Sequence, residues 1–215
     1  MSIGSAEEYL LELLNPSDEQ GKRKTALLQA TFDVIAELGF EGLRTRAVAD
    51  RAGVNIATLH YYFPGKQALI EGVAQFLGAK FVALHGPAPA PSGFAALDRL
   101  RQEFSDGHYY FEHQPQMLMV LQEFTLRGRR DPEVQKVVEM MYGHWRRNLE
   151  KMVVAGLAEG TFRSELNPEE TLAMLLCVFS GASARRDNDF DDVQRGVERW
   201  LLTEEIWAAT RGVEQ

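Results

Sequence analysis

Apolar residues recur at intervals of three and four through most of the chain. The first clear case is the stripe of Leu27, Val34, Ile35 and Leu38, which Gly39 brings to an end. Spacing of this kind indicates amphipathic helices packed on a core. Sustained alternation of apolar and polar residues, the main signal of strands, is missing from the sequence. The pattern therefore predicts an all-α protein of about nine helices.

Residues that cap or break helices predict where these helices begin and end. Asn55 is a good N-cap for a short helix over 56–62. Asp131-Pro132 and Asn167-Pro168 each place a capping side chain before a proline suited to a first helical turn. A last helix is expected over 191–209.

Three short helices are expected between residues 21 and 66, and Gly53 permits a tight left-handed turn before the third. This arrangement is typical of a helix-turn-helix, in which the last helix lies in the major groove of DNA. Such a helix needs an apolar side for docking, and Leu59 and Phe63 are four residues apart. The opposite side would remain exposed, which makes 56–62 the candidate for reading bases.

The distribution of charge along the chain favours DNA binding by this segment, although the net charge of the whole chain does not. The chain carries a net charge of −8, which is unfavourable for binding an anionic polymer. Residues 21–66 hold seven bases and four acids, a local charge of +3, so the remainder carries −11. Basic charge is thus concentrated in the segment predicted to meet DNA.

Two segments of this region resemble the N-terminal domain of TetR (tetracycline-repressor-like) family regulators. They are GFEGLRTRAVADRAGV, from Gly39 to Val54, and TLHYYFPGKQAL, from Thr58 to Leu69. The resemblance implies a helix-turn-helix DNA-binding domain over 21–66 and a larger helical ligand-sensing and dimerisation domain over 67–215. Residues 1–20 form an N-terminal extension with no counterpart in the family.

The resemblance also implies which residues contact DNA. Arg44 departs from the family, where Thr or Ser is common, and His60 stands where Tyr is commonest, so the operator sequence stays open. Positions that match phosphate contacts are Thr45, Tyr62 and Lys66; groove-facing positions are Arg46, Ile56, Ala57, Thr58, His60 and Tyr61; and Lys22, Arg23 and Lys24 match a basic arm.

The rest of the chain is expected to sense a ligand and to dimerise. Methionine and aromatic residues suit the lining of an apolar pocket, although an ordinary core would look the same. The resemblance implies that the last two long helices pair with those of a second subunit. The pocket candidates are Phe104, His108, Phe111, Met117, Met141 and Trp145, and the interface candidates are Leu172, Leu176, Phe179, Val193, Val197 and Trp200.

These observations predict a ligand-responsive transcriptional regulator of the repressor type. It would bind a palindromic operator as a homodimer and leave it when a small, largely apolar effector binds. Activation in place of repression stays open, as does the identity of the effector. A protein-interaction adaptor that keeps a helix-turn-helix shape is the main alternative, and an all-helical enzyme is a further one.

Little in the sequence favours the enzyme. Metalloprotease, nucleophile-elbow and phosphate-loop motifs are missing, so no catalytic, metal or cofactor site is expected. Cys177 is the single cysteine, which excludes an internal disulfide. Neither an export signal nor an apolar run of membrane-spanning length is found, so we expect a cytoplasmic protein without membrane contact.

Overall fold

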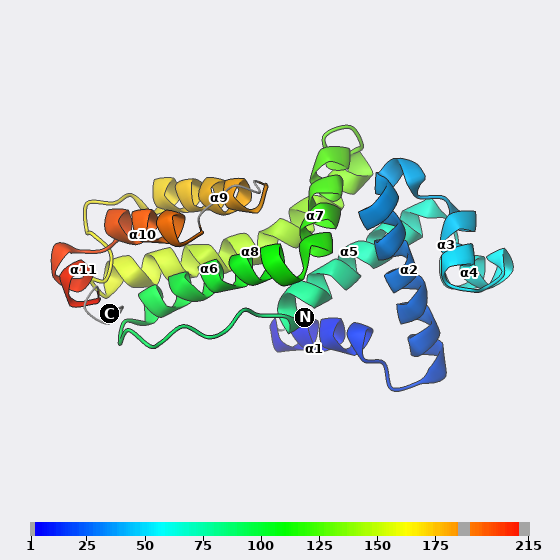
Figure 1. The fold of residues 1–215 in the computed structure, drawn as a ribbon, viewed down its shortest axis with the longest axis horizontal. Coiled ribbons are helices and arrows are strands. Elements are labelled where there is room, and N and C mark those ends of the chain that lie inside the picture. Colours follow the sequence, from blue (N-terminus) through cyan, green and yellow to red (C-terminus); the bar gives the residue numbers. More distant parts are fainter. Residues whose placement is uncertain (1–2, 185–189, 211–215) are drawn as a thin grey trace. The chain divides into compact units, whose positions relative to one another are not determined.

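A computed structural model describes residues 3–184 and 190–210 of the chain, and the described part is formed by helices (Figure 1). They are α1 (Ile3–Leu14), α2 (Glu19–Gly42), α3 (Thr45–Arg51), α4 (Ile56–Tyr62), α5 (Lys66–Ala83), α6 (Ala95–His113), α7 (Pro115–Gly128), α8 (Pro132–Ala158), α9 (Pro168–Ala184), α10 (Phe190–Leu201) and α11 (Glu204–Thr210). The all-α prediction is confirmed.

The described residues divide into two compact units. The first unit contains residues 3–84 and 114–142, so α7 and the beginning of α8 belong with the N-terminal helices. The second unit contains 85–113, 143–184 and 190–210. Whether these units correspond to separate DNA-binding and sensing functions remains a prediction.

The first unit is built around α2, which packs against α3, α5 and α7. Leu28 and Ile35 on α2 are fully buried. Phe32 meets Phe76 of α5 edge-on, with ring centroids 6.2 Å apart. The N-terminal extension adds α1, which packs mainly on α5. Because α2 touches all of these helices, its position determines where the short helices α3 and α4 lie.

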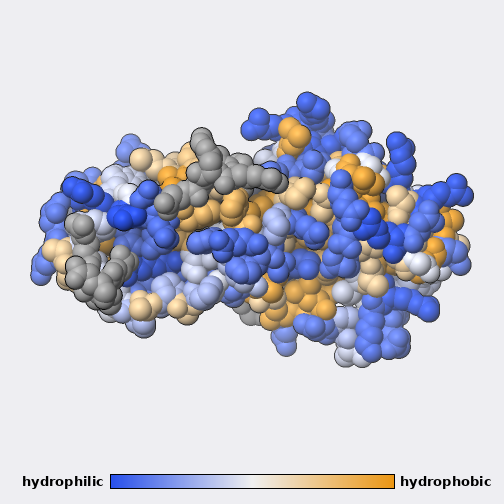
Figure 2. Space-filling view, in the orientation of Figure 1, coloured by the Kyte–Doolittle hydropathy of each residue, from blue (hydrophilic) through white to orange (hydrophobic). Residues whose placement is uncertain are grey.

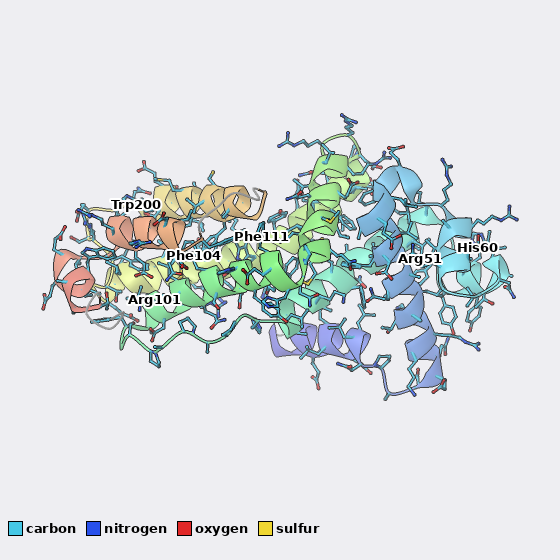
Figure 3. The ribbon with its side chains drawn as sticks, in the orientation of Figure 1. Arg51, His60, Arg101, Phe104, Phe111 and Trp200 are labelled. Atoms are coloured by element: carbon cyan, nitrogen blue, oxygen red, sulfur yellow. The ribbon has the colours of Figure 1, made fainter. Side chains whose placement is uncertain are left out.

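The second unit has an apolar core enclosed by α6, α8, α9, α10 and α11. Within it, Arg101 of α6 binds Glu198 of α10 through two parallel hydrogen bonds of 2.9 Å (Figure 3 labels Arg101). Both side chains are largely buried. The core residues include Leu97, Leu100, Phe104, Leu149, Phe162, Leu172, Leu175 and Leu201.

The described part of the chain has eleven helices, two more than the nine expected. The N-terminal extension accounts for one, α1. The other arises because the expected helix over 191–209 is interrupted at Leu202 and Thr203, where Leu202 pairs with Phe162 in an isolated β-bridge. Arg163 also donates from Nε to the Leu202 carbonyl, 2.7 Å away. These long-range bonds compete with helical ones and leave α10 and α11 separate.

No helix among the described residues is long and apolar enough to cross a membrane.

The Arg101–Glu198 pair predicts a strong effect on stability. Replacing Glu198 by Ala leaves the Arg101 guanidinium buried without its carboxylate, which costs about 3 kcal/mol of unfolding free energy. The unfolding midpoint in urea should fall accordingly. The control is Glu133→Ala, which breaks an exposed ion pair with Lys136 and should leave the midpoint almost unchanged. Equal midpoints for the two variants would contradict the expectation.

Candidate nucleic-acid interface

The helices α3 and α4 form a helix-turn-helix next to α2 (Figure 1). Gly53 lies in the turn between them with φ 66°, a left-handed value that side chains other than glycine rarely adopt. Asn55 then caps α4, since its side chain accepts a hydrogen bond of 2.8 Å from the backbone N–H of Thr58. The turn and the cap together set the direction in which α4 leaves α3.

Burial on one side of α4 determines which residues face solvent. Leu59 is fully buried and Phe63, directly after the helix, is 3% exposed, as the sequence predicted. The side chains of Ile56, Ala57 and His60 are exposed, and Tyr61 is 73% exposed. Figure 3 labels His60 on this helix, and Figure 2 shows a mostly hydrophilic surface here with a small apolar patch.

The remaining two candidates on α4 are half-buried. The Thr58 hydroxyl lies 3.0 Å from the Asn55 side-chain oxygen, so this hydroxyl belongs to the helix cap. The Tyr62 ring meets Tyr61 edge-on, with centroids 5.1 Å apart. The Tyr61 hydroxyl in turn accepts a hydrogen bond of 3.5 Å from Gln20. The ring contact and the hydrogen bond restrict the side-chain rotamers of the two tyrosines in the protein without DNA.

The helix α3 is fixed to α2 by burial and by charge. Val48 and Ala49 are buried beneath it. Arg51 binds both carboxylate oxygens of Glu37, with Nη1 2.8 Å from Oε1. The hydrogen bonds from Arg51 hold the pKa of Glu37 below its ordinary value. An ion pair with two parallel bonds fixes orientation as well as distance, so α3 cannot readily rotate on α2.

Two of the three candidate phosphate contacts, Thr45 and Lys66, are the first residues of helices, while Tyr62 is the last residue of α4. Thr45 is the first residue of α3 and is half-buried, while Arg44 is the N-cap and makes no capping bond through its side chain. Arg46 is exposed, as is Lys66 at the start of α5.

The basic arm lies in the first turns of α2. Lys22 and Arg23 are exposed and Lys24 is half-buried. The Lys22 ammonium binds the Glu19 carboxylate at 2.8 Å, an exposed pair that contributes little to stability. DNA phosphates can replace that partner at small cost, so the arm remains suitable for a polyanion.

The six pocket candidates fall into both units. Met117 is buried and Met141 half-buried in the first. In the second, Phe104 is buried, and His108 stacks on Phe190 with ring centroids 5.2 Å apart. Phe111 and Trp145 are half-buried in the second unit (Figure 3 labels Phe111).

Two open clefts among the described residues are lined by residues other than these candidates. One, of about 400 Å³, is formed in the first unit by α1, α2 and α5, and includes Phe76 and Lys80. The other, of about 360 Å³, lies in the second unit beside Phe94 and Ile206. The pocket candidates thus remain predictions.

The six dimer candidates lie in or against the core of the second unit. Leu172 and Val197 belong to the buried core, while Leu176, Phe179, Val193 and Trp200, labelled in Figure 3, are partly buried against it. The exposed side of α9 instead presents Ala173, Met174 and Cys177. Amphipathic spacing locates an apolar stripe, but it cannot tell burial within one chain from burial between two.

Two carboxylates with specific partners were not found by sequence reasoning. Glu103 accepts a hydrogen bond of 2.9 Å from the Trp145 indole, and burial raises its pKa. Glu123 of α7 accepts a bond of 3.0 Å from the backbone N–H of Phe40. The only sequence signal for either is an acid on an amphipathic helix, which is too common to be specific.

The described residues contain no cluster of three or more histidine, cysteine, aspartate or glutamate side chains placed to hold a metal ion.

Known proteins are similar to this chain mainly over the segment that contains the helix-turn-helix. Residues 27–73 match the family described as bacterial regulatory proteins, tetR family. The HTH-type transcriptional repressor KstR of Rhodococcus jostii is 28% identical over 116 residues, covering 54% of this chain and 45% of that protein. KstR of Mycobacterium tuberculosis is 43% identical over 65 residues, covering 30% of this chain and 28% of that protein. The chain thus spans less than half the length of these two relatives.

The fold as a whole also has solved counterparts. A TetR-family transcriptional regulator from Rhodococcus sp. superposes with a TM-score of 0.74 at 21% identity, covering 85% of this chain and all (100%) of that one. The match over the helix-turn-helix and the shared all-helical fold agree with the geometry of α3 and α4. Over residues 27–73 the chain is therefore similar in sequence to the TetR family of bacterial regulatory proteins, and over most of its length it is similar in fold to a TetR-family regulator.

Proposed function

We propose that this protein is a DNA-binding transcriptional regulator without enzymatic activity. In finer detail, we propose a cytoplasmic repressor that binds a palindromic operator as a homodimer and is released by a small, largely apolar effector. The observation that carries the proposal is the exposed side of α4, which is held outward because Leu59 and Phe63 are buried beneath it.

The exposed side of α4 has the chemistry that base reading requires. His60 and Tyr61 carry polar groups at the ends of flat rings, and these can bond base edges or phosphates. Ile56, 44% exposed, can contact only apolar groups such as a thymine methyl. Ala57 is small enough to let the backbone of α4 approach the groove closely. An ordinary solvated surface has no need for an exposed isoleucine next to two aromatic rings.

Flanking groups would supply the sequence-independent part of the affinity. Lys22, Arg23, Arg46 and Lys66 are exposed in the same unit as α4. Each lysine or arginine that neutralises a phosphate releases a counterion, so binding should weaken steeply with salt. An adaptor that only retained the shape would show weak association without preference for a palindrome.

Dimerisation would follow from the symmetry of such an operator, since two half-sites require two copies of α4. For the interface we propose the exposed side of α9, where Ala173, Met174 and Cys177 present small or apolar groups. Met174 is 50% exposed, so half of this apolar side chain is available to a second subunit.

The second unit offers a polar group within apolar surroundings, as an effector site would need. Glu103 is 12% exposed, and the Trp145 ring that binds it packs edge-on against Phe179 with centroids 5.9 Å apart. Phe104 lies against the same Phe179 ring, at 4.8 Å. We propose that an effector with a flat apolar body and one polar group binds at this cluster.

Selection of bound duplexes from a random pool tests DNA recognition. The native protein should recover a palindrome, with an affinity that falls steeply as salt is raised. His60→Ala should weaken binding to the recovered palindrome about tenfold, because a base-edge contact is lost. The matched control is His113→Ala, an exposed histidine on α6, which should leave the affinity unchanged. Recovery of no common sequence, or equal losses for the two variants, would count against the proposal.

Sedimentation velocity tests the interface on α9. The native protein should sediment as a dimer, and Met174→Glu should shift it toward the monomer because a charge would be buried between the two subunits. Met140→Glu makes the same change at an exposed methionine of α8 and should remain dimeric. A native monomer at micromolar concentration would exclude the proposed assembly.

The raised pKa of Glu103 predicts how stability depends on pH. Because burial favours the neutral carboxyl in the folded state, stability falls as the pH rises from the ordinary glutamate pKa to the raised folded pKa, and the full stability is present below the ordinary pKa. Glu103→Gln keeps an acceptor for Trp145 without the charge. Its unfolding midpoint should exceed that of the native protein at pH 7, and the difference should vanish near about pH 4. A difference independent of pH would show that the pKa of Glu103 is the same in the folded and the unfolded state.

A further inference from the structure

The helix α2 is broken three residues before its end. Gly39 has φ 65° and ψ −176°, so it departs from helical geometry while the residues on both sides are helical. We call Gly39–Leu43 the α2–α3 corner, because α3 begins two residues later at Thr45. The ψ of Gly39 rotates the following peptide, and the N–H of Phe40 no longer points along the helix as it would in a continuous one.

A side chain from another helix accepts a hydrogen bond from that N–H. Glu123 of α7 accepts it at 3.0 Å through Oε2. The carboxylate fits because residue 39 has no side chain, since a Cβ added there would lie 3.0 Å from the same oxygen. The contact resembles an N-cap, in which an oxygen satisfies the first free N–H of a helical turn. Here the cap comes from a residue 83 positions away in the sequence.

The neighbours of Glu123 on α7 hold the same corner. The Phe124 ring meets Phe40 edge-on, with centroids 5.0 Å apart, and both rings are buried. Arg127 lies one turn further along and reaches Glu41 at 3.8 Å. One side of α7 therefore contacts two consecutive residues of the corner, through a charge-assisted bond, a ring pair and an exposed ion pair.

We propose that Glu123 is a positioning residue for DNA binding, which sets the orientation of α3 and α4 through the Phe40 N–H. This inference rests on the proposed function, because it assumes that α4 reads DNA. Leu43 is the last residue of the corner and is 2% exposed, and its N–H donates to the Phe40 carbonyl at 3.2 Å. A shift of Phe40 is thus passed directly to the start of α3. Binding sites lose affinity when the residues that hold the contacting groups are loosened.

Operator affinity tests the proposal, with the recovered palindrome as the probe in fluorescence anisotropy. Glu123→Ala should raise the Kd about tenfold or more, although residue 123 itself is not placed on the DNA-reading face. Glu123→Gln keeps a side-chain oxygen for the Phe40 N–H and should stay within about threefold of native. Native affinity in Glu123→Ala, or equal losses in the two variants, would overturn the assignment.

Asp98→Ala is the matched control. It removes a carboxylate that accepts a backbone N–H in the same way, from Ser92 at 2.6 Å, but in the second unit. Its operator affinity should stay within about twofold of native, whatever the change in unfolding midpoint. If Asp98→Ala weakened binding as much as Glu123→Ala, the effect would be general loss of stability and the proposal would be wrong.

Hydrogen exchange separates this inference from the proposed function. In Glu123→Gln and Glu123→Ala we measure exchange of the Phe40 amide and of the segment 43–63, without DNA. The alanine variant should exchange faster than native at both, and the glutamine variant should remain close to native. Unchanged exchange in the alanine variant would overturn the inference. Failure of the native protein to select any palindrome would instead overturn the proposed function. The hydrogen-exchange result would then still show that Glu123 holds the α2–α3 corner.

Discussion

The docking of α4 on Leu59 and Phe63 is the contact on which the candidate site depends. A helix of seven residues is unstable by itself in water, so tertiary burial has to maintain it. Each large apolar side chain buried in this way contributes about 2–5 kcal/mol relative to alanine. With these two positions inside, helical periodicity forces His60 and Tyr61 outward. The same burial that makes α4 a helix therefore also makes it a surface suited to DNA.

The sequence predicted this part of the molecule because its determinants are local. The Asn55 cap, the turn at Gly53 and the spacing of Leu59 and Phe63 all act within ten residues, and each has the predicted conformation or burial. The Asn167 cap of α9 is a further local signal that the structure contains, bonded to the N–H groups that follow it. Local signals of this kind can be read without knowing which helices are neighbours.

What could not be predicted depends on residues far apart in the chain. The interruption between α10 and α11 arises from pairing of Leu202 with Phe162. The residues next to Leu202 in the sequence contain no glycine or proline that would predict a break in the helix. Glu123 and Glu103 have their roles only because Phe40 and Trp145 lie beside them. The dimer stripe shows the same limit, because partial burial of Phe179 against its own unit satisfies the amphipathic pattern without any second subunit.

The energies at the α2–α3 corner are of the size that regulation requires. A hundredfold change in operator affinity corresponds to about 2.7 kcal/mol of differential free energy. A charge-assisted hydrogen bond such as that of Glu123 contributes about 1.5–3 kcal/mol, and an aromatic pair such as Phe40–Phe124 adds about 0.5–1.5 kcal/mol. The Arg127–Glu41 pair adds little, because both groups are in contact with solvent. A displacement of α7 that broke the first two contacts together would therefore change the free energy that holds the α2–α3 corner by about this amount, while the Arg51–Glu37 pair would still hold α3 on α2.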